Sequence, residues 1–405
     1  MPPLSPRDQL ALLARGTVEI ISEEALLAKL EQRRPLRVKL GLDPTAPDIH
    51  LGNAIVLQKL RQFQDLGHEA ILVIGDFTGL IGDPSGRSDT RPQLSREAIE
   101  RNAATYRDQY SRILDAGRAR VVFNSEWLAP MTFVDVIRLA ARATVHRLLE
   151  RDDFANRYRE HLPIHLHELL YPLCQAYDSV AIQADVELGG TDQKFNNLMG
   201  RELQREMGQE PQVVVLTPLL PGLDGVQKMS KSLGNAIGIT EPPNEMYAKV
   251  MSIPDDLMIP YFEYCTLMPL DEVRSLESAL RRGTAHPRDV KQRLAHVITA
   301  RHWGETAADA AAVEFTRVFR EHERPEDIPD VAVSRAQIRN GTMRLAHLLV
   351  ALKLAPSNTE ARRLIDQGGV TFDDTRAKRD VDVPVRDGLV VRVGRRRFAR
   401  VRLTA

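Results

Sequence analysis

The chain has 405 residues, more than one ordinary domain contains, so two or three domains are expected. Its hydrophobic content of 43% and charged content of 27% are typical of a globular protein, and no apolar run is long enough to span a membrane. Only two cysteines occur, Cys174 and Cys265, which excludes a disulfide framework and favours a reducing, cytoplasmic compartment.

The net charge is zero overall but is unevenly distributed along the chain. Residues 331–405 contain 16 Lys and Arg against 7 Asp and Glu, so this segment carries +9 and the rest of the chain carries −9. A basic C-terminal segment on an acidic body indicates a polyanionic partner. A solvated basic surface is the alternative explanation of the same charge.

The first half of the sequence predicts strands that alternate with helices, the pattern of a doubly wound α/β protein with a parallel sheet. A strand over 36–42 is followed by a turn with two prolines and by a helix over 51–66, where apolar residues recur with helical spacing. Ser95 is the expected N-cap of a further helix over about 95–114. The other predicted strands are 70–74, 120–123, 180–183 and 213–216.

Helices dominate two other stretches. Residues 131–177 interrupt the alternation and predict a helical insertion, and residues 242 to about 322 are again mainly helical in pattern. Residues 321–330 are polar and contain two prolines, which indicates a linker. We therefore expect an α/β domain over 1–241 that contains the insertion, an α-helical domain over 242–330 and a small basic α+β domain over 341–405.

The first motif that can handle phosphate lies where the helix after the first strand begins. Residues 44–53 read Pro-Thr-Ala-Pro-Asp-Ile-His-Leu-Gly-Asn. A helix N-terminus offers unpaired N–H groups and the positive end of the helix dipole, and Gly52 lets a nucleotide lie close to the backbone. Thr45, His50 and Asn53 can add side-chain hydrogen bonds. Taken alone, the same residues would also fit a capped helix with a surface histidine.

The second motif is a polar loop with two lysines three residues apart. Residues 228–232 read Lys-Met-Ser-Lys-Ser and are flanked by Gly222, Gly225 and Gly234. Lysines on such a flexible loop can close over a triphosphate as charge develops on it. A solvated basic loop is the alternative if the motif is taken alone. No Gly-x-x-x-x-Gly-Lys-Ser/Thr loop and no Gly-x-Gly-x-x-Gly fingerprint occurs.

In this order, the two motifs resemble the HIGH and KMSKS signatures of class I aminoacyl-tRNA synthetases. The resemblance implies a Rossmann-like catalytic domain, in which an amino-acid carboxylate attacks the α-phosphate of ATP and the aminoacyl group then passes to tRNA. Mg²⁺ is expected to come with ATP as substrate, and no tightly bound cofactor or protein-held metal is expected. The implied catalytic residues are Thr45, His50, Asn53, Lys228 and Lys231. The implied ATP-binding residues are Gly52, Gly190, Asp192, Arg87, Arg91 and Ser232.

The predicted helix over 169–178 carries a phenol, an amide and a carboxylate on one face. Tyr171, Gln175 and Asp178 are spaced at i, i+4 and i+7. A carboxylate in an apolar slot can accept a hydrogen bond from a substrate phenol, whereas phenylalanine would leave it buried and unpaired. This kind of discrimination has a known precedent in a tyrosyl enzyme. An amphipathic helix with a polar outer face is the alternative.

Within the class I synthetases, the chain resembles the tyrosyl-tRNA synthetases in particular. Three stretches carry this resemblance, residues 81–87, 169–178 and 189–193. The resemblance implies that Asp178 holds the substrate hydroxyl and that Gln193 approaches the carboxylate. It places Tyr171, Gln175 and Asp83 around the α-ammonium, Asp192 and Gly190 at the ribose, and Asp43 near the ammonium or ATP.

The sequence departs from the better-known branch of that family at two positions. Lys39 stands where that branch often has a tyrosine, which gives the substrate phenol a second hydrogen bond. The Lys39 side chain is expected either to reach the phenol hydroxyl itself or to pair with Asp178. A KMSKS loop also replaces the common KFGKT variant. Tryptophanyl-tRNA synthetases and a non-catalytic RNA-binding protein with a synthetase-like core are the two rival hypotheses.

The basic C-terminal segment predicts, over 343–373, two amphipathic helices followed by a glycine turn into a strand, with Ser357 and Glu360 spaced as a capping box. It resembles an RNA-binding module first known from a ribosomal small-subunit protein, although a domain that only packs on the body is the alternative. Arg362, Arg363, Arg395, Arg396 and Arg397 are the expected phosphate contacts. The resemblance also implies anticodon binding by the helical domain, tRNA(Tyr), L-tyrosine and ATP as partners, and a homodimer through residues of about 131–154.

Overall fold

The computed structural model describes residues 4–44, 48–84, 95–320, 328–338, 341–373, 375–377, 379–394 and 397–404. The chain divides into two compact units, Met1–Asp309 and Ala310–Ala405. The first unit contains a six-stranded sheet and most of the helices, and the second contains a smaller sheet with its own apolar core. Among the described residues, no helix combines the length and apolar character that a membrane span requires.

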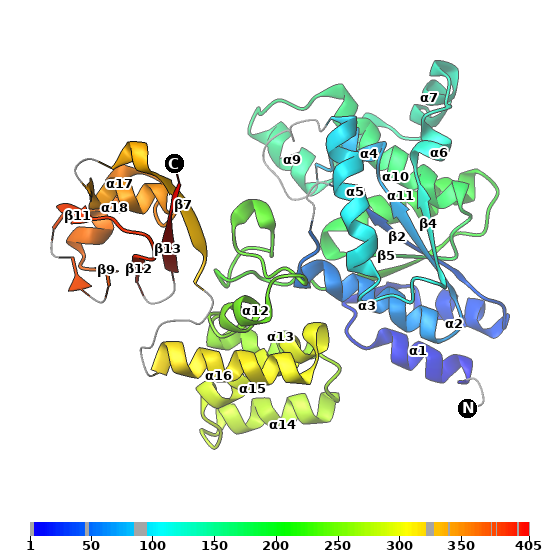
Figure 1. The fold of residues 1–405 in the computed structure, drawn as a ribbon. Helices are drawn as coiled ribbons and strands as arrows, with labels where there is room; N and C mark the ends of the chain where they lie inside the picture. The colour runs from blue at the N-terminus through cyan, green and yellow to red at the C-terminus, as the bar shows by residue number, and fades with distance from the viewer. Residues whose placement is uncertain are drawn as a thin grey trace. The chain divides into compact units, whose positions relative to one another are not determined.

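The large sheet has the strand order β1-β6-β5-β2-β3-β4 (Figure 1). All neighbouring strands run parallel except β1, which pairs antiparallel with β6. The order reverses between β2 and β5, and ligands of open α/β sheets bind at such a switch point. The strands are β1 Glu19–Ile21, β2 Arg37–Leu42, β3 Glu69–Ile74, β4 Ala119–Phe123, β5 Val186–Gly190 and β6 Val213–Thr217.

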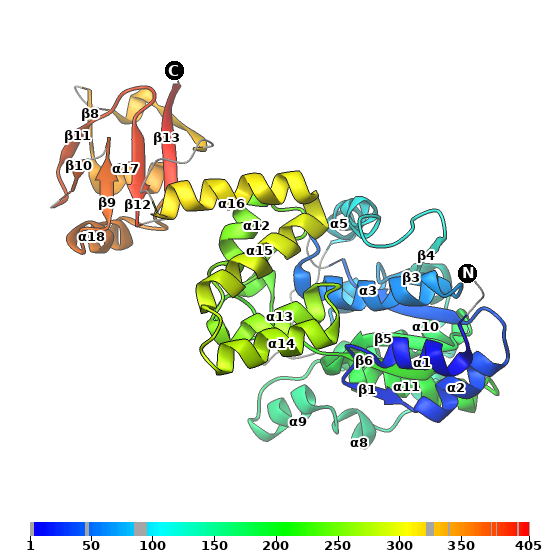
Figure 2. The same ribbon diagram turned by 90° about the horizontal axis from the view of Figure 1, so that it is seen from below.

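Helices cover both faces of this sheet (Figure 2). Helix α3 packs against β2, β3 and β5, and α11 packs against β5 and β6. The β2–α3–β3 and β5–α11–β6 crossovers run in opposite directions along the sheet, so right-handed connections place their helices on opposite faces. The helices before the insertion are α1 Pro6–Ala14, α2 Glu23–Glu31, α3 Leu51–Asp65, α4 Thr78–Ile81, α5 Arg96–Tyr110 and α6 Ser125–Leu128.

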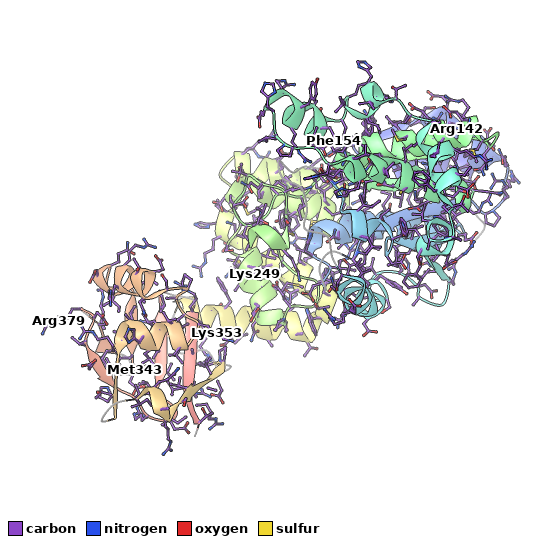
Figure 3. The ribbon with its side chains drawn as sticks, turned by 90° about the horizontal axis from the view of Figure 1, so that it is seen from above. Arg142, Phe154, Lys249, Met343, Lys353 and Arg379 are labelled. Atoms are coloured by element: carbon purple, nitrogen blue, oxygen red, sulfur yellow. The ribbon has the colours of Figure 1, made fainter. Side chains whose placement is uncertain are left out.

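The insertion between β4 and β5 is helical, as predicted. Its first helix, α7, exposes apolar side chains, whereas Phe154 of α9 is fully buried. Figure 3 labels Phe154 and also Arg142, which follows α7. The helices from the insertion to β6 are α7 Phe133–Ala140, α8 Val145–Leu148, α9 Asp152–Arg159, α10 Tyr171–Ala181 and α11 Lys194–Glu206, with short 3₁₀ turns at Leu166–Leu170 and Thr191–Gln193.

The segment after β6 and the phosphate loop is helical. Helix α15 packs on α12 and α13, and α13 also contacts α3. The 3₁₀ turns here are Lys231–Leu233 and Asp255–Leu257. The helices are α12 Pro243–Val250, α13 Met258–Cys265, α14 Leu270–Arg281, α15 Pro287–Trp303 and α16 Glu305–Arg320.

The C-terminal unit is an α+β domain in which two helices cover a five-stranded sheet of order β10-β9-β12-β13-β7. Figure 3 labels Met343, Lys353 and Arg379 in this unit. A separate two-stranded sheet joins β8 and β11. The elements are β7 Asp330–Ser334, β8 Thr342–Arg344, α17 Leu345–Ala351, α18 Asn358–Asp366, β9 Val370–Phe372, β10 Thr375–Arg376, β11 Asp382–Pro384, β12 Val390–Val393 and β13 Arg397–Thr404, with a 3₁₀ turn at Arg335–Gln337.

The predicted strand over 180–183 is wrong. Helix α10 continues to Ala181 and ends where Gln183 adopts a positive φ of 51°. The β-branched run there belongs to the last helical turn, and the true strand, β5, begins at Val186. The sequence did not indicate β5, because its glutamate and two glycines are unusual in a buried strand.

Two further expectations concern helix caps and the edge of the C-terminal unit. Ser95 caps α5, since its Oγ accepts from the N–H of Ala98 at 3.2 Å. Ser357 caps α18 in the same way, but Glu360 pairs with Arg363, so no reciprocal capping box is present. Strand β7 pairs with β13 and therefore adds to the C-terminal sheet a segment that lies before the expected start at 341.

Candidate active site

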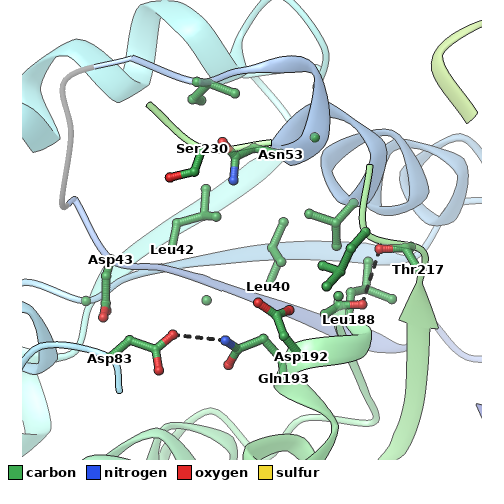
Figure 4. A pocket seen from close by; sticks show the side chains of 18 of the residues that line it. Leu40, Leu42, Asp43, Asn53, Asp83, Leu188, Asp192, Gln193, Thr217 and Ser230 are labelled. Carbon is green, nitrogen blue, oxygen red and sulfur yellow. Dashed lines mark hydrogen bonds between the residues drawn. The ribbon is translucent and has the colours of Figure 1, made fainter. Parts of the chain in front are cut away.

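A cavity of about 450 Å³ lies at the carboxyl ends of β2 and β5 (Figure 4). It occupies the switch point of the sheet, where a doubly wound fold is expected to bind a ligand. Most of the predicted site residues line it. They are Asp43, His50, Gly52, Asn53, Asp83, Tyr171, Gln175, Asp178, Gly190, Asp192, Gln193, Lys228 and Lys231.

The other predicted residues of this site lie outside the described part or away from the cavity. Thr45, Arg87 and Arg91 fall outside the described residues, and for Ser232 only the backbone is described. Lys39 is the one described residue of the set that does not line the cavity.

Backbone hydrogen bonds join the first phosphate-handling motif to residues 237–239, which follow the second motif. The N–H of Leu51 donates to the carbonyl of Ile237 at 2.9 Å, and the N–H of Ile239 donates to the carbonyl of Ile49 at 3.0 Å. Gly52 lies against Met229, because a Cβ at position 52 would be 3.6 Å from the Met229 side chain and 3.1 Å from the His50 ring. Segments nearly 190 residues apart therefore form one wall of the cavity.

His50 caps helix α3 with its ring. Its Nδ1 accepts from the N–H of Asn53, and the Asn53 side chain accepts from the N–H of His50, both at 3.3 Å. Burial, together with the charges of Lys231 and Lys228, lowers the pKa of His50 to about 4. The ring is therefore neutral near pH 7, and because Nδ1 accepts, Nε2 carries the proton. His50 can act as a neutral hydrogen-bond donor.

Both lysines of the second motif contact carboxylates. Lys228 Nζ lies 2.9 Å from Asp192 Oδ2, and Lys231 forms an ion pair with Asp48. All four side chains remain partly exposed, so a polyphosphate could compete for the two ammonium groups. The two lysines bring cationic groups to one end of the cavity, where each is paired with a carboxylate.

Helix α5 holds the backbone of the first motif, and one of its residues, Tyr106, also lines the cavity. The Asn102 amide donates to the carbonyl of Pro44 at 2.8 Å, and the Tyr106 hydroxyl donates to the carbonyl of Asp43 at 3.3 Å. Gln109 accepts from the N–H of Ile49 at 2.5 Å. These contacts were not predicted, because nothing in the local sequence of a helix shows which loop it supports.

Asp178 lines the cavity and is 3% exposed. Its Oδ1 accepts from the Trp127 indole N–H at 2.8 Å, and its Oδ2 accepts from the Asn124 amide at 3.4 Å. Burial raises the pKa of Asp178 to about 7, although Lys39 and these two donors oppose the shift. Trp127 and Asn124 lie just after β4 and were missed by the sequence analysis.

A second acidic group lies where β2 and β3 end. The hydroxyls of Tyr171 and Thr78 donate to Asp43 at 2.8 and 2.7 Å. Gly75 permits this arrangement, because a Cβ there would be 1.9 Å from Asp43 Oδ1. Burial and the nearby carboxylates of Asp43 and Asp83 raise the pKa of Tyr171 well above its usual value, so Tyr171 stays a donor.

Asp83 is tied to the insertion and to α11. Gln193 donates to its Oδ2 at 2.9 Å, as Figure 4 shows, and Arg151 donates to its Oδ1 at 3.2 Å. Arg151 is buried and also pairs with Asp153 at 2.8 Å. The predicted ammonium-binding residues thus lie in an acidic pocket. Arg151, which pairs with Asp83 there, comes from the insertion, and the sequence analysis did not connect it to the site.

The expectation that Lys39 contacts the ligand is corrected by the structure. Lys39 is fully buried, and its ammonium group points from β2 to α10 and β5. Its partners are the carbonyl of Gln175, the hydroxyl of Ser179 and the carboxylate of Glu187, which account for all three of its protons. The ion pair forms with Glu187 and not with Asp178.

The predicted phosphate contacts of the C-terminal unit lie on its surface where they are described. Arg363 pairs with Glu360 at 2.6 Å, Arg362 lies 3.4 Å from Asp380, and Arg397 donates to the carbonyl of Leu354 at 2.9 Å. Arg395 and Arg396 fall outside the described residues. Over the described part of the chain, no cluster of three His, Cys, Asp or Glu side chains is placed to hold a metal ion.

Comparisons with known proteins agree with this geometry. The family model described as tRNA synthetases class I (W and Y) matches residues 31–320, and the S4 domain model matches residues 343–390. The chain is 56% identical over 398 residues to a tyrosine–tRNA ligase of Moorella thermoacetica, which covers 97% of this chain and 95% of that protein. It is 53% identical over 394 residues to one from Haemophilus influenzae, with 97% and 96% covered.

The fold is also similar to solved structures. One is a tyrosyl-tRNA synthetase from Archaeoglobus fulgidus complexed with L-tyrosine, with a TM-score of 0.62 and 26% identity. That match covers 76% of this chain and 99% of the other.

Proposed function

Because this chain belongs to the class I tRNA synthetases of the tryptophan and tyrosine group, we propose that it is a tyrosine–tRNA ligase, with tyrosyl-adenylate as its intermediate. The observation that carries the proposal is that both signature motifs and Asp178 line one cavity. Relatives that resemble it over nearly its whole length include several tyrosine–tRNA ligases, which disfavours the tryptophanyl alternative. Both motifs are present in that cavity, which disfavours the non-catalytic alternative.

Tyrosine fits the cavity with its ammonium group at the acidic pocket and its phenol at Asp178. Asp83, Tyr171 and Gln175 surround the ammonium, Gln193 lies near the carboxylate, and Asp43 orients Tyr171. The phenol O–H donates to Asp178, whose other polar neighbours, Trp127 and Asn124, are both donors. A side chain without a hydroxyl would leave this buried carboxylate without that partner.

ATP then lies along the wall that the two motifs form. Gly52 and Gly190 let the nucleotide approach the backbone, Asp192 accepts from the ribose, and His50 donates from Nε2. The tyrosine carboxylate attacks the α-phosphorus in line, and pyrophosphate leaves with the negative charge. Lys228 and Lys231 stabilise that charge after exchanging their carboxylate partners for phosphate oxygens. Mg²⁺ accompanies ATP and is held mainly by its phosphates.

Transfer to tRNA is the second step, and we propose that the C-terminal unit and the helices after residue 242 bind the tRNA. The match to the S4 domain model and the basic charge of residues 331–405 support this role. We also propose a cytoplasmic homodimer. Its support is the exposed apolar face of α7, where Phe133, Val134 and Ile137 are each more than half exposed.

Removing the charge of Lys231 is expected to slow adenylate formation. Lys231→Ala should lower the kcat of tyrosine-dependent ATP–pyrophosphate exchange by about a hundredfold, the scale of one preorganised charge contact. The matched variant Asp48→Asn keeps the lysine but removes its carboxylate partner, so it should lower the KM for ATP severalfold. Near-normal exchange in Lys231→Ala would contradict the role of this lysine.

Changing Asp178 to an amide is expected to weaken tyrosine binding and selectivity. Asp178→Asn should raise the KM for tyrosine by about 10- to 100-fold, because a charged hydrogen bond is lost. Because its pKa is about 7, Asp178 loses its charge progressively as the pH falls through that value, so wild-type kcat/KM for tyrosine should fall as the pH drops below 7. This acidic limb should be absent in Asp178→Asn. Unchanged kinetics of Asp178→Asn with tyrosine and phenylalanine would contradict the role of Asp178 in tyrosine recognition.

Ending the chain at Arg320 is expected to separate adenylate formation from transfer of tyrosine to tRNA. The first unit has its own core, so the truncated protein should retain pyrophosphate exchange and lose most tRNA charging. In the full chain, Arg362→Ala with Arg363→Ala should weaken tRNA binding and reduce its salt dependence. Full charging by the truncated protein would refute the RNA-binding role.

Placing a charge on the apolar face of α7 is expected to dissociate the homodimer. Phe133 is 80% exposed, and Phe133→Arg would bury an unpaired charge if that face is an interface. Light scattering should give the mass of two chains for the wild type and of one for the variant. Arg138→Gln on the same helix is the control and should remain dimeric.

A further inference from the structure

A buried ion pair lies beneath the cavity, between two neighbouring strands of the large sheet. Lys39 on β2 and Glu187 on β5 are paired in register, and their side chains meet at 2.9 Å. Lys39 is fully buried and Glu187 is 1% exposed. Both charges are thus held away from solvent at the switch point where the ligand is expected.

The pair is fully hydrogen-bonded to its surroundings. Lys39 donates to Glu187, to the carbonyl of Gln175 at 2.9 Å and to the hydroxyl of Ser179 at 2.8 Å. Glu187 Oε2 accepts from Ser179 at 3.1 Å and from the amide of Gln212. Apolar residues of similar volume often replace a buried pair without loss of stability, so stability alone does not explain this one.

The ion pair contacts Gln175 through both its backbone and its side chain. Lys39 holds its backbone carbonyl, and Glu187 Oε1 lies 3.4 Å from its side-chain nitrogen. The Gln175 oxygen then accepts from Asn196 at 3.0 Å, and Asn196 also donates to Gln193 at 3.0 Å. Two of the residues proposed to hold tyrosine, Gln175 and Gln193, are therefore oriented through one network that ends at the ion pair.

The pair also acts on the residue proposed to hold the phenol. Asp178 lies on α10 between the two residues that Lys39 contacts. Burial raises the pKa of Asp178, Lys39 opposes this shift, and Glu187 adds to it more weakly. The neighbouring Cys174 has a thiol pKa raised to about 12 by burial, so it is neutral and adds no charge. Lys39 therefore favours the ionised form of Asp178.

We propose that Lys39 and Glu187 form a positioning pair for tyrosine, which sets the orientation of Gln175 and of the helix α10 that carries Asp178 without touching the substrate. Lys39 thus supports tyrosine recognition from beneath the cavity, in place of the direct phenol contact expected from the sequence. This inference rests on the proposed function. It predicts an effect on tyrosine binding that is separable from folding and from ATP binding.

The test replaces both charges together, because removing one alone would leave the other buried and unpaired. The double variant Lys39→Met with Glu187→Gln should raise the KM for tyrosine about tenfold in pyrophosphate exchange. Its kcat should change less than threefold and its KM for ATP should stay unchanged. The acidic limb of kcat/KM for tyrosine should move to higher pH, because the lysine's attraction for Asp178 outweighs the glutamate's repulsion.

A second buried pair serves as the matched control. Arg157 and Glu168 in the insertion are each 2% exposed and lie 2.8 Å apart, away from the cavity lining. Arg157→Met with Glu168→Gln should lower the thermal stability to a comparable extent but leave the KM for tyrosine and its pH profile as in the wild type. A purely structural role for Lys39 and Glu187 would make the two double variants behave alike.

The uncharged variant Ser179→Ala covers the case in which the double variant fails to fold. It removes one partner of each charge, and it should raise the KM for tyrosine two- to threefold with kcat unchanged. A wild-type KM and pH profile in a folded double variant, or an unchanged KM in Ser179→Ala, would overturn the positioning role. Absence of tyrosine-dependent exchange in the wild-type protein would instead overturn the proposed function itself.

Discussion

The antiparallel backbone contact between Ile49–Leu51 and Ile237–Ile239 is the constraint on which the site depends. The parallel sheet by itself places only the first motif at the switch point, because that motif follows β2 directly. The second motif lies on a loop beyond β6 and needs a separate tether. Two backbone hydrogen bonds supply that tether, and they bring Met229 against Gly52 and the lysine charges close to His50.

This arrangement divides the cavity electrostatically. Lys228 and Lys231 lie at one end, and Asp43, Asp83 and Asp178 lie toward the other. A polyphosphate matches the end with the lysines, and a zwitterionic amino acid with a phenol matches the acidic end. Burial and the lysine charges together keep His50 neutral, so its ring adds a hydrogen bond and no charge. Asp48 and Asp192 are the carboxylate partners of the two lysines, and we propose that phosphate oxygens replace them when ATP binds.

The sequence predicted those residues of the candidate site that belong to a short motif or to one face of a single helix. His50, Asn53, Lys228 and Lys231 lie in short motifs, and Tyr171, Gln175 and Asp178 follow the spacing of one helix. The sequence could not predict Trp127, Asn124 or Arg151, because each reaches the site from an element remote in sequence from its partner. The strand β5 was missed for a related reason. Its glutamate is tolerated in a buried strand only because of a lysine 148 positions earlier.

The buried position of Lys39 shows why its identity alone could not predict a direct contact with the ligand. A cation on β2 in a fully buried register position requires an anion within reach, and the neighbouring strand supplies one at the paired position. Once Glu187 is present, the ammonium group is drawn under α10, where a carbonyl and a hydroxyl satisfy its two remaining protons. Position 39 is therefore best understood together with position 187, and we propose that the effect of this pair on a ligand passes through α10.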